Sequence, residues 1–167
     1  ENVEKILEDN RNKFLVEIAN DNSEGQIVLS GTNQDLEKLN LILKNNKIKN
    51  IKLPVSAPFH CSLMHKATNV MKNELSKLQF KKGVNVLISN ITADEIFNAD
   101  ELKDLLVKQI ENRVRWRESV INMINKEVDQ FIEIGPGKVL SGLIKRINNE
   151  VNVSSINNVE DIKNIKV

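Results

Sequence analysis

The feature that most constrains the fold is a run of apolar and β-branched residues that is followed by a proline, a histidine and a helical pattern. The run extends from Ile48 to Val55, Pro58 follows it, and His60 lies just beyond. A strand, a tight loop and a helix in this order are typical of α/β folds, in which loops at strand ends present side chains to a ligand. This segment therefore predicts a fold class and also a candidate site.

The residues before this loop predict a small lobe in which helices and strands are mixed. The expected elements, in order, are a helix that ends near Arg11, strands at 14–19 and 26–30, a helix capped by Thr32 or Asn33, and the strand at 47–55. This α-β-β-α-β order is that of a ferredoxin-like lobe without its first strand. It assigns residues 1–55 to that lobe.

After His60 the patterns alternate between helices and strands. We expect helices over 63–78, over a segment capped by Asp100, over 116–125, after Gly137 and over 159–165, with strands at 84–89, 130–134 and 151–156. Such alternation is typical of a parallel sheet, so the expected fold class is α/β. The helix at 63–78 carries one apolar stripe, formed by Met64, Ala67, Met71, Leu75 and Leu78.

Composition excludes several classes of function. The chain has 167 residues, of which 40% are hydrophobic and 28% charged, and its net charge of +1 argues against a nucleic-acid surface. No apolar run approaches the roughly 20 residues of a membrane span. The single cysteine, Cys61, excludes an internal disulfide and fits a reducing compartment. Neither His60 nor His65 has carboxylates or thiolates at ligand spacing, so we expect no metal site.

Three further motifs follow the histidine: Leu106-Val107-Lys108-Gln109, Val114-Arg115-Trp116, and the stretch 132–140 with Gly135-Pro136-Gly137-Lys138 at its centre. Together with the segment 55–64, their order and spacing resemble the C-terminal part of malonyl-CoA:acyl-carrier-protein transacylases. The resemblance covers nearly the whole chain. It implies that residues 56–167 form the C-terminal part of an α/β-hydrolase-like lobe with a parallel sheet.

The same resemblance implies a reaction and its partners. Malonyl would move from coenzyme A to a serine and then to acyl carrier protein, as in type II fatty acid biosynthesis. The partners would be malonyl-CoA and acyl carrier protein. Coenzyme A and phosphopantetheine thioesters would be substrates, and no other cofactor is implied.

His60 is the leading candidate for catalysis. A neutral imidazole can take a proton from a hydroxyl and return it to a leaving group near neutral pH, although a histidine after a proline can also be an ordinary loop residue. The resemblance implies that His60 is the general base that activates the serine. It also implies that the main-chain carbonyl of Gln109 orients the ring. By spacing alone, Gln109 would be only the polar edge of an amphipathic helix.

Two features bear on the substrate. The resemblance implies that Phe59 favours malonyl, because a ring beside the acyl α-carbon leaves no room for an extra methyl group; the alternative is that Phe59 packs in the core. Gly135, Pro136 and Gly137 form a strand-to-helix turn whose amides can approach a thioester or a pantetheine arm. The alternative is a tight turn that the strand and the helix require, and the spacing is not that of a P-loop.

The sequence departs from the family in what it lacks. It contains no Gly-x-Ser-x-Gly elbow, and Ser141 falls within a predicted helix. In the family the serine elbow, an oxyanion glutamine and a carboxylate-binding arginine all lie upstream of the residue that matches Glu1. We therefore expect the upstream half of the same enzyme to be a partner. We also expect this chain to be inactive alone and to fold poorly alone, because a missing central strand leaves backbone groups unpaired.

The segment 113–117 is expected to be structural. Arg113 stands where the family usually has proline, Trp116 is a core anchor, and Arg115 and Arg117 are expected to be solvated.

Two other functions stay open. The acyltransferase domain of a polyketide synthase or of a multifunctional fatty-acid synthase would carry the same motifs. A non-catalytic ferredoxin-like binding module would fold by itself and would not need His60. The bias toward Asn and Lys indicates an AT-rich genome, so the expected location is the bacterial cytoplasm or a plastid such as the apicoplast.

Overall fold

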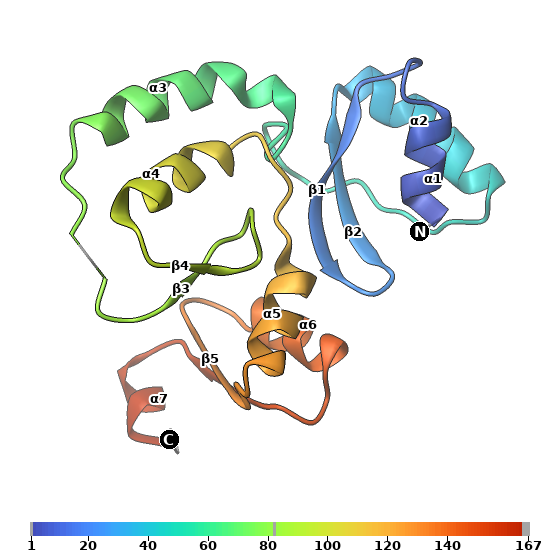
Figure 1. The fold of residues 1–167 in the computed structure, drawn as a ribbon. Coiled ribbons are helices and arrows are strands. Elements are labelled where there is room, and N and C mark those ends of the chain that lie inside the picture. Colours follow the sequence, from blue (N-terminus) through green and yellow to red (C-terminus); the bar gives the residue numbers. More distant parts are fainter. Residues whose placement is uncertain (1, 82, 165–167) are drawn as a thin grey trace.

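A β-hairpin with a helix on either side of it in sequence forms the N-terminal group of elements in the computed structural model, which describes residues 2–81 and 83–164 (Figure 1). The elements are α1 (Asn2–Asp9), β1 (Val16–Ser23), β2 (Gln26–Gly31) and α2 (Asn33–Asn45). The two strands pair antiparallel. Thr32 caps α2, because its hydroxyl oxygen accepts the Asp35 N–H at 3.1 Å. The predicted α-β-β-α order is thus confirmed, with Thr32 as the cap.

The strand predicted at 47–55 is not formed. The chain has no regular secondary structure from 48 to 55, and the side chains of Ile51 and Val55 are 78% and 62% exposed. A strand needs a neighbour that pairs with its backbone groups, and no described strand lies beside this segment. The β-branched pattern therefore formed no strand here, since none of the described strands supplies a pairing partner.

Two helices and a very short strand pair form the second group (Figure 1). The elements are the 3₁₀ helix η1 (Ser62–Met64), α3 (His65–Ser76), β3 (Leu87–Ile88), β4 (Glu95–Ile96) and α4 (Ala99–Lys108). Helix α3 packs against α4. The buried strand predicted at 84–89 is wrong in extent and in burial, since only two residues pair and Val84 is fully exposed. Asn98 rather than Asp100 caps α4, because its side-chain oxygen accepts the N–H groups of Asp100 and Glu101.

The third group carries the main hydrophobic core. Its elements are α5 (Trp116–Asn125), β5 (Gln130–Ile134), α6 (Val139–Ile147), β6 (Asn152–Ile156) and α7 (Val159–Asn164). β5 and β6 pair in parallel, which confirms the parallel pairing for these two strands. Val120, Phe131, Ile144 and Val151 form a buried cluster with Trp116 packed against it, so Trp116 is the core anchor that the sequence predicts. The predicted helix end at Ile165 lies outside the described residues.

The segment between α4 and α5 joins the hairpin to the rest of the molecule. Val114 donates its N–H to the Ala19 carbonyl at 2.8 Å and accepts the Asp21 N–H at 2.9 Å. These two bonds add a short parallel bridge to β1. Across residues 2–81 and 83–164, none of the helices is both long and apolar enough to cross a membrane.

Candidate active site

His60 lies in the loop before η1, in a backbone conformation that non-glycine residues seldom adopt. Its φ is +58, in the left-handed region. The His60 N–H donates to the carbonyl oxygen of Ile110 at 3.1 Å, and the next residue, Cys61, is fully buried. A long-range hydrogen bond and a buried neighbour thus stabilise an otherwise costly conformation.

The His60 ring is bonded to the end of α4. Its Nδ1 lies 2.6 Å from the main-chain oxygen of Gln109. Because a carbonyl oxygen only accepts, Nδ1 must carry the proton, and Nε2 then keeps its lone pair. The contact between His60 and Gln109 is the one expected from the sequence. The catalytic roles of both residues stay predictions.

The carbonyl groups that hold His60 are available for a general reason. The last carbonyls of an α-helix have no partner within the helix, and Gln109 and Ile110 follow α4 directly. Both of these carbonyls accept from His60, one from the ring and one from the backbone.

A cleft of about 390 Å³ opens beside the ring. Its lining is mostly apolar, which suits an acyl chain or a thioester arm more than a charged ligand. Three residues of the predicted stripe, Met64, Ala67 and Met71, line this cleft, and no residue of α3 is buried. The lining residues are Phe59, His60, Met64, Ala67, Met71, Gln109 and Ile110.

Phe59 belongs to the cleft and is half exposed. The alternative that Phe59 packs in the core is therefore wrong. Its N–H donates to the Ala57 carbonyl at 3.0 Å, which tightens the loop before His60.

Glu17 of β1 ties the small hairpin to this loop. Its Oε1 accepts the backbone N–H of Ser62 at 3.1 Å and also the Ser62 hydroxyl. The sequence offered no signal for this contact, because the two residues are distant in the chain and Glu17 belongs to no motif. The position of the loop after His60 therefore depends on the hairpin.

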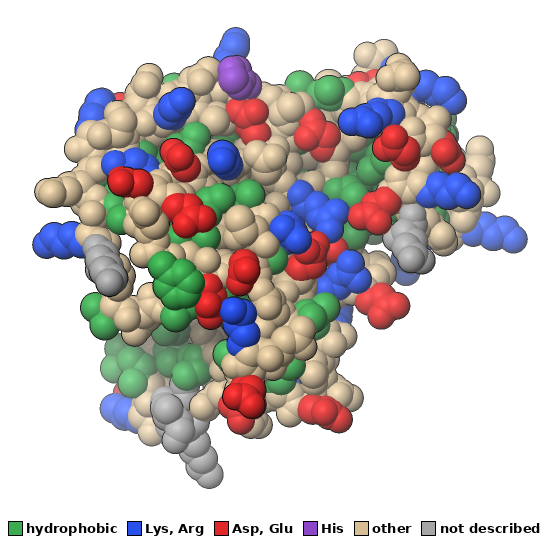
Figure 2. All heavy atoms as spheres, viewed as in Figure 1, with side chains coloured by type: hydrophobic (Ala, Val, Ile, Leu, Met, Phe, Trp, Pro, Cys, Tyr) green, Lys and Arg blue, Asp and Glu red, His purple; other side chains and the backbone are tan. Residues whose placement is uncertain are grey.

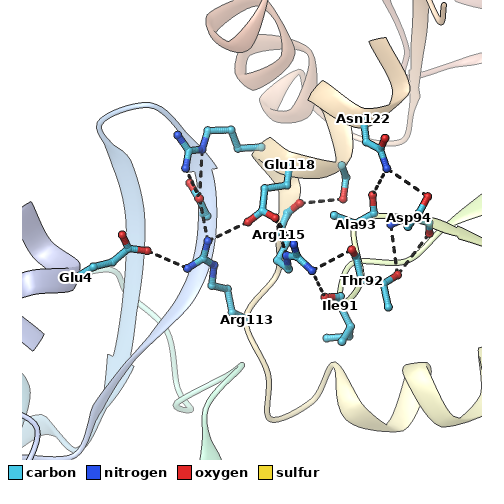
Figure 3. A network of polar contacts seen from close by, with 12 residues as sticks. Glu4, Ile91, Thr92, Ala93, Asp94, Arg113, Arg115, Glu118 and Asn122 are labelled. Carbon is cyan, nitrogen blue, oxygen red and sulfur yellow. Dashed lines mark hydrogen bonds and ion pairs between the residues drawn. The ribbon is translucent and has the colours of Figure 1, made fainter. Parts of the chain in front are cut away.

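A network of charged side chains holds the segment that follows Gln109 (Figure 3). Arg115 donates through Nε to Glu118 Oε2 at 2.8 Å, and Arg117 donates through Nη2 to Asp21 Oδ2 at 2.9 Å. Arg113 donates to the same Asp21 oxygen at 3.1 Å. Arg115 and Arg117 were expected to be solvated, but both side chains are only partly exposed and their guanidinium groups are bonded, Arg115 to Glu118 and Arg117 to the almost completely buried Asp21 carboxylate.

The ionisation of this network is set by its own hydrogen bonds. The side-chain bond from Arg115 is the largest cause that lowers the pKa of Glu118 below its ordinary value. The same bond raises the pKa of Arg115. Both groups are therefore charged at neutral pH.

The turn at Gly135, Pro136 and Gly137 lies at the carboxyl end of β5, and none of the three is among the described residues that line the cleft. Gly135 and Gly137 have φ values of +142 and +98, which glycine adopts readily. The Gly137 N–H already donates to Asn157 Oδ1 at 2.5 Å. The structure therefore supports the simple turn, and contact with a thioester stays a prediction.

Ser141 has a structural role in this region. It lies in α6, and its hydroxyl donates to Glu133 Oε2 at 2.6 Å. Glu133 also accepts the Leu140 and Ser141 N–H groups, and the Ser141 hydroxyl is the largest cause that lowers the pKa of this carboxyl. Glu133 thus stabilises the first turn of α6.

The second histidine lies apart from the cleft lining. His65 is at the start of α3, its side chain is 70% exposed, and its Nδ1 lies 3.2 Å from Glu111 Oε1. No group of three or more potential metal ligands occurs among residues 2–81 and 83–164.

Comparisons with known proteins give both the class and the relatives of this chain. No protein-family model matches it. An acyl-carrier-protein S-malonyltransferase from Bartonella henselae superposes with a TM-score of 0.92 at 38% identity, over 98% of this chain and 52% of that one. A type II PKS acyl carrier protein in complex with its malonyl-transacylase gives a TM-score of 0.90 at 30% identity, over 96% of this chain and 52% of that one. The chain thus has the α/β fold of an acyltransferase.

The sequence comparison is more specific. The malonyl CoA-acyl carrier protein transacylase of Bacillus subtilis is 40% identical over 150 residues, which are 89% of this chain and 47% of that protein. The predicted resemblance is therefore confirmed, and the chain is homologous to a C-terminal portion of malonyl CoA-acyl carrier protein transacylases. It spans about half the length of the curated malonyl transacylases it matches.

Proposed function

We propose that this chain supplies the general-base half of a malonyl-CoA:acyl-carrier-protein transacylase. The single observation that carries the proposal is the bond between His60 Nδ1 and the Gln109 carbonyl beside an apolar cleft. This bond leaves the Nε2 lone pair available as a base. The homology to malonyl transacylases supplies the substrate class.

The malonyl group would be transferred in two steps. The Nε2 atom of His60 takes the proton of a serine hydroxyl while the serine oxygen attacks the thioester carbonyl of malonyl-CoA. The protonated ring then gives this proton to the departing coenzyme A sulfur, and malonyl stays on the serine as an ester. In the second transfer His60 takes the proton of the phosphopantetheine thiol, whose sulfur attacks the ester, and returns it to the serine oxygen.

The serine would come from the upstream half of the same enzyme, because this sequence has no elbow and Ser141 is bound to Glu133. Exposed apolar side chains support this pairing. Ile51 and Val55 lie in the segment that forms no strand, and Ile134 of β5 is 79% exposed. Figure 2 shows further hydrophobic side chains at the surface around β5 and beside α7. Such a large exposed apolar area is unusual for a monomer and fits a surface that another segment covers.

The division into lobes belongs to the same proposal. Residues 1–55 would be the small ferredoxin-like lobe, completed by an upstream strand beside the segment 47–55. Residues 56–167 would complete an α/β-hydrolase-like lobe in which β5 and β6 join further parallel strands. The cellular compartment and the plastid alternative remain expectations from the sequence.

Phe59 and the Gly135-Pro136-Gly137 turn would contact the substrate. Phe59 is supported by its place in the cleft, where its ring would exclude a methyl group on the acyl α-carbon. The turn has weaker support, since one of its amides is already bonded to Asn157.

The direct test is a malonyl transfer assay with malonyl-CoA and acyl carrier protein. The full-length protein should transfer malonyl, and this chain alone should not, because it lacks a serine placed by an elbow. Mixing this chain with the separately produced upstream half should restore transfer. Transfer by this chain alone at the rate of the full-length protein would contradict the division of roles.

A second function is favoured by one comparison. The structure with the bound carrier protein concerns a type II PKS acyl carrier protein, so the same chemistry would serve polyketide synthesis. Assays with carrier proteins from fatty-acid and polyketide systems distinguish the two roles by their relative rates. A ferredoxin-like binding module without catalysis would instead fold by itself and would show no malonyl transfer, with or without His60.

A further inference from the structure

Asn90 connects the turn after β3 to both ends of the segment that holds His60. Its side-chain Nδ2 donates to Gln109 Oε1 at 3.2 Å. Its main-chain oxygen accepts the Arg115 N–H at 2.9 Å. The Gln109 side chain is thus held by the residue that also fixes the end of the connection between α4 and α5.

The turn that carries Asn90 is itself firmly held. The Ala93 N–H donates to the Ser89 carbonyl at 2.9 Å, and the Ser89 N–H donates to the Asp94 carbonyl at 3.0 Å. Arg115 donates through Nη1 to the carbonyl oxygens of Ile91 and Thr92 at 3.2 and 2.9 Å (Figure 3). Asn90 therefore projects from a rigid support and not from a free loop.

Gln109 has two polar groups with different partners. Its main-chain oxygen accepts from the His60 ring, and its side-chain oxygen accepts from Asn90. Gln109 is the C-cap of α4: its N–H still donates to the Leu105 carbonyl at 3.0 Å, and the Ile110 N–H of the next peptide donates to the Val107 carbonyl at 3.2 Å, but the Gln109 carbonyl lies beyond the last helical turn. A bond to the side chain is a direct way to fix the orientation of this residue.

We propose that Asn90 is a positioning residue that holds Gln109 so that its main-chain carbonyl keeps the proton on Nδ1 of His60. This inference rests on the proposed function of His60 as a base. It predicts that loss of Asn90 disturbs the tautomer and the orientation of His60, although Asn90 does not touch the ring.

Asn122 offers a matched control. It lies on α5, and its Nδ2 donates to the Ala93 carbonyl at 2.9 Å, so it binds the same turn from another element. The same amide also donates to Asp94 Oδ1 at 3.3 Å, so its side-chain contacts are with the turn and not with Gln109. A variant at Asn122 therefore removes an amide donor from the same turn while leaving the contact with Gln109 in place.

The experiment uses the full-length protein and the variants Asn90→Ala, Asn122→Ala, Gln109→Ala and the double variant at 90 and 109. We expect Asn90→Ala to lower kcat/KM for malonyl transfer by about tenfold, since small misplacements of a catalytic group are costly. Gln109→Ala should have a similar effect, and the double variant should be no worse than either single one. Asn122→Ala should stay within about twofold of the wild type.

The readout that a purely structural role would not move is the tautomer of the His60 ring. Nitrogen-15 shifts of the imidazole, assigned with His60→Gln, should show the Nδ1–H form in the wild type and in Asn122→Ala. Mixed tautomers are expected in Asn90→Ala. Should Asn90→Ala fail to fold, Asn90→Leu keeps a side chain of about the same size and removes the donor without adding a charge.

Two results would overturn the proposed role of Asn90 without affecting the proposed function of His60. One is an unchanged tautomer and rate in the Asn90 variant, and the other is multiplicative loss in the double variant. Near-normal transfer by His60→Ala would defeat the proposed function and this inference together. The two failures are therefore distinguishable by the His60 variant.

Discussion

The region around β5 and β6 and the loop that carries His60 are held in place by different forces. The first buries Val120, Phe131, Ile144 and Val151 in one cluster. The second has an exposed approach at 48–55 and is fixed by hydrogen bonds from His60 to two carbonyls and from Ser62 to Glu17. A packed core tolerates little loss of volume, whereas a hydrogen-bonded loop allows side chains to change at little cost in stability.

This difference indicates that the packed cluster supplies most of the stability, whereas the loop with His60 supplies the proposed chemistry. Substitutions in the packed region should change the free energy of unfolding first. Substitutions in the hydrogen-bonded region should change transfer first. The predictions below test this separation in the full-length protein.

The largest effect is expected at His60. His60→Ala should lower malonyl transfer by at least about a hundredfold, because a general base contributes on the order of 10²–10⁴ in rate. Thermal unfolding should hardly change, since the side chain is only half-buried in a cleft. Gln109→Ala should cost much less, because it keeps the carbonyl. Equal losses in the two variants would show that the Gln109 side chain is the functional group.

In the packed region we expect a loss of stability with little loss of transfer activity. Phe131→Ala should lower the free energy of unfolding by about 3–5 kcal/mol, since it leaves a cavity in the cluster. Transfer by the protein that remains folded should be close to normal. Phe97→Ala is the matched control, because Phe97 is 69% exposed and its removal leaves no cavity. If Phe131→Ala lowered the free energy of unfolding by less than about 1 kcal/mol, the packed region would not be the main source of stability.

Phe59 should affect the choice of substrate. Phe59→Ser enlarges the cleft, so the rate with methylmalonyl-CoA relative to malonyl-CoA should rise by about tenfold, the usual worth of one methyl group in a fitted site. The measurement is the ratio of kcat/KM values for the two substrates. An unchanged ratio would assign the selectivity to residues outside this loop, and unfolding of this variant should resemble that of the wild type.

The smallest effect is expected from the charged network, and it should depend on pH. The pKa of Glu118 is lowered in the folded state, so its ion pair stabilises the fold above the ordinary glutamate pKa of about 4.3. That contribution is lost as the pH falls through the lowered pKa. Glu118→Gln should therefore reduce the free energy of unfolding by about 1 kcal/mol at pH 7 and by progressively less below pH 4.

The matched control for the network is Glu74→Gln on α3. Glu74 pairs with Lys77 at 2.6 Å, and both side chains are more than half exposed, so this change should have little effect at either pH. The free energy of unfolding should differ between the wild type and Glu118→Gln at pH 7 but much less at pH 3. An equal difference at both pH values would mean that the ion pair of Glu118 does not contribute to stability.

Two predicted strands show how far local pattern can be trusted. The residues at 130–134 form β5 because β6 follows within reach and α6 covers the connection. The residues at 47–55 have a comparable β-branched pattern and form no strand, because no described strand pairs with them. The β-branched pattern shows that a segment prefers the strand conformation. Whether it forms a strand depends on another strand that lies beside it and pairs with it.

The site was predictable where motif residues contact one another. The segment 55–64 and the motif that ends at Gln109 indicated the pair of His60 and Gln109, and the structure brings them to 2.6 Å. Asn90, Glu17 and the pairing of Asp21 with two arginines had no comparable signal. Their partners are far away in sequence, and each residue type is also common on exposed surfaces.

By itself, the sequence determined which segments become helices, since apolar spacing and caps such as Thr32 act within a few residues. It also determined the chemistry that His60 can perform, because that chemistry belongs to the imidazole. Only the tertiary structure decided that Arg117 binds the buried Asp21, that Ala67 and Met71 of α3 line a cleft, and that 47–55 forms no strand. The physical reason is that burial, ion pairing and strand pairing depend on neighbours that are distant in the chain.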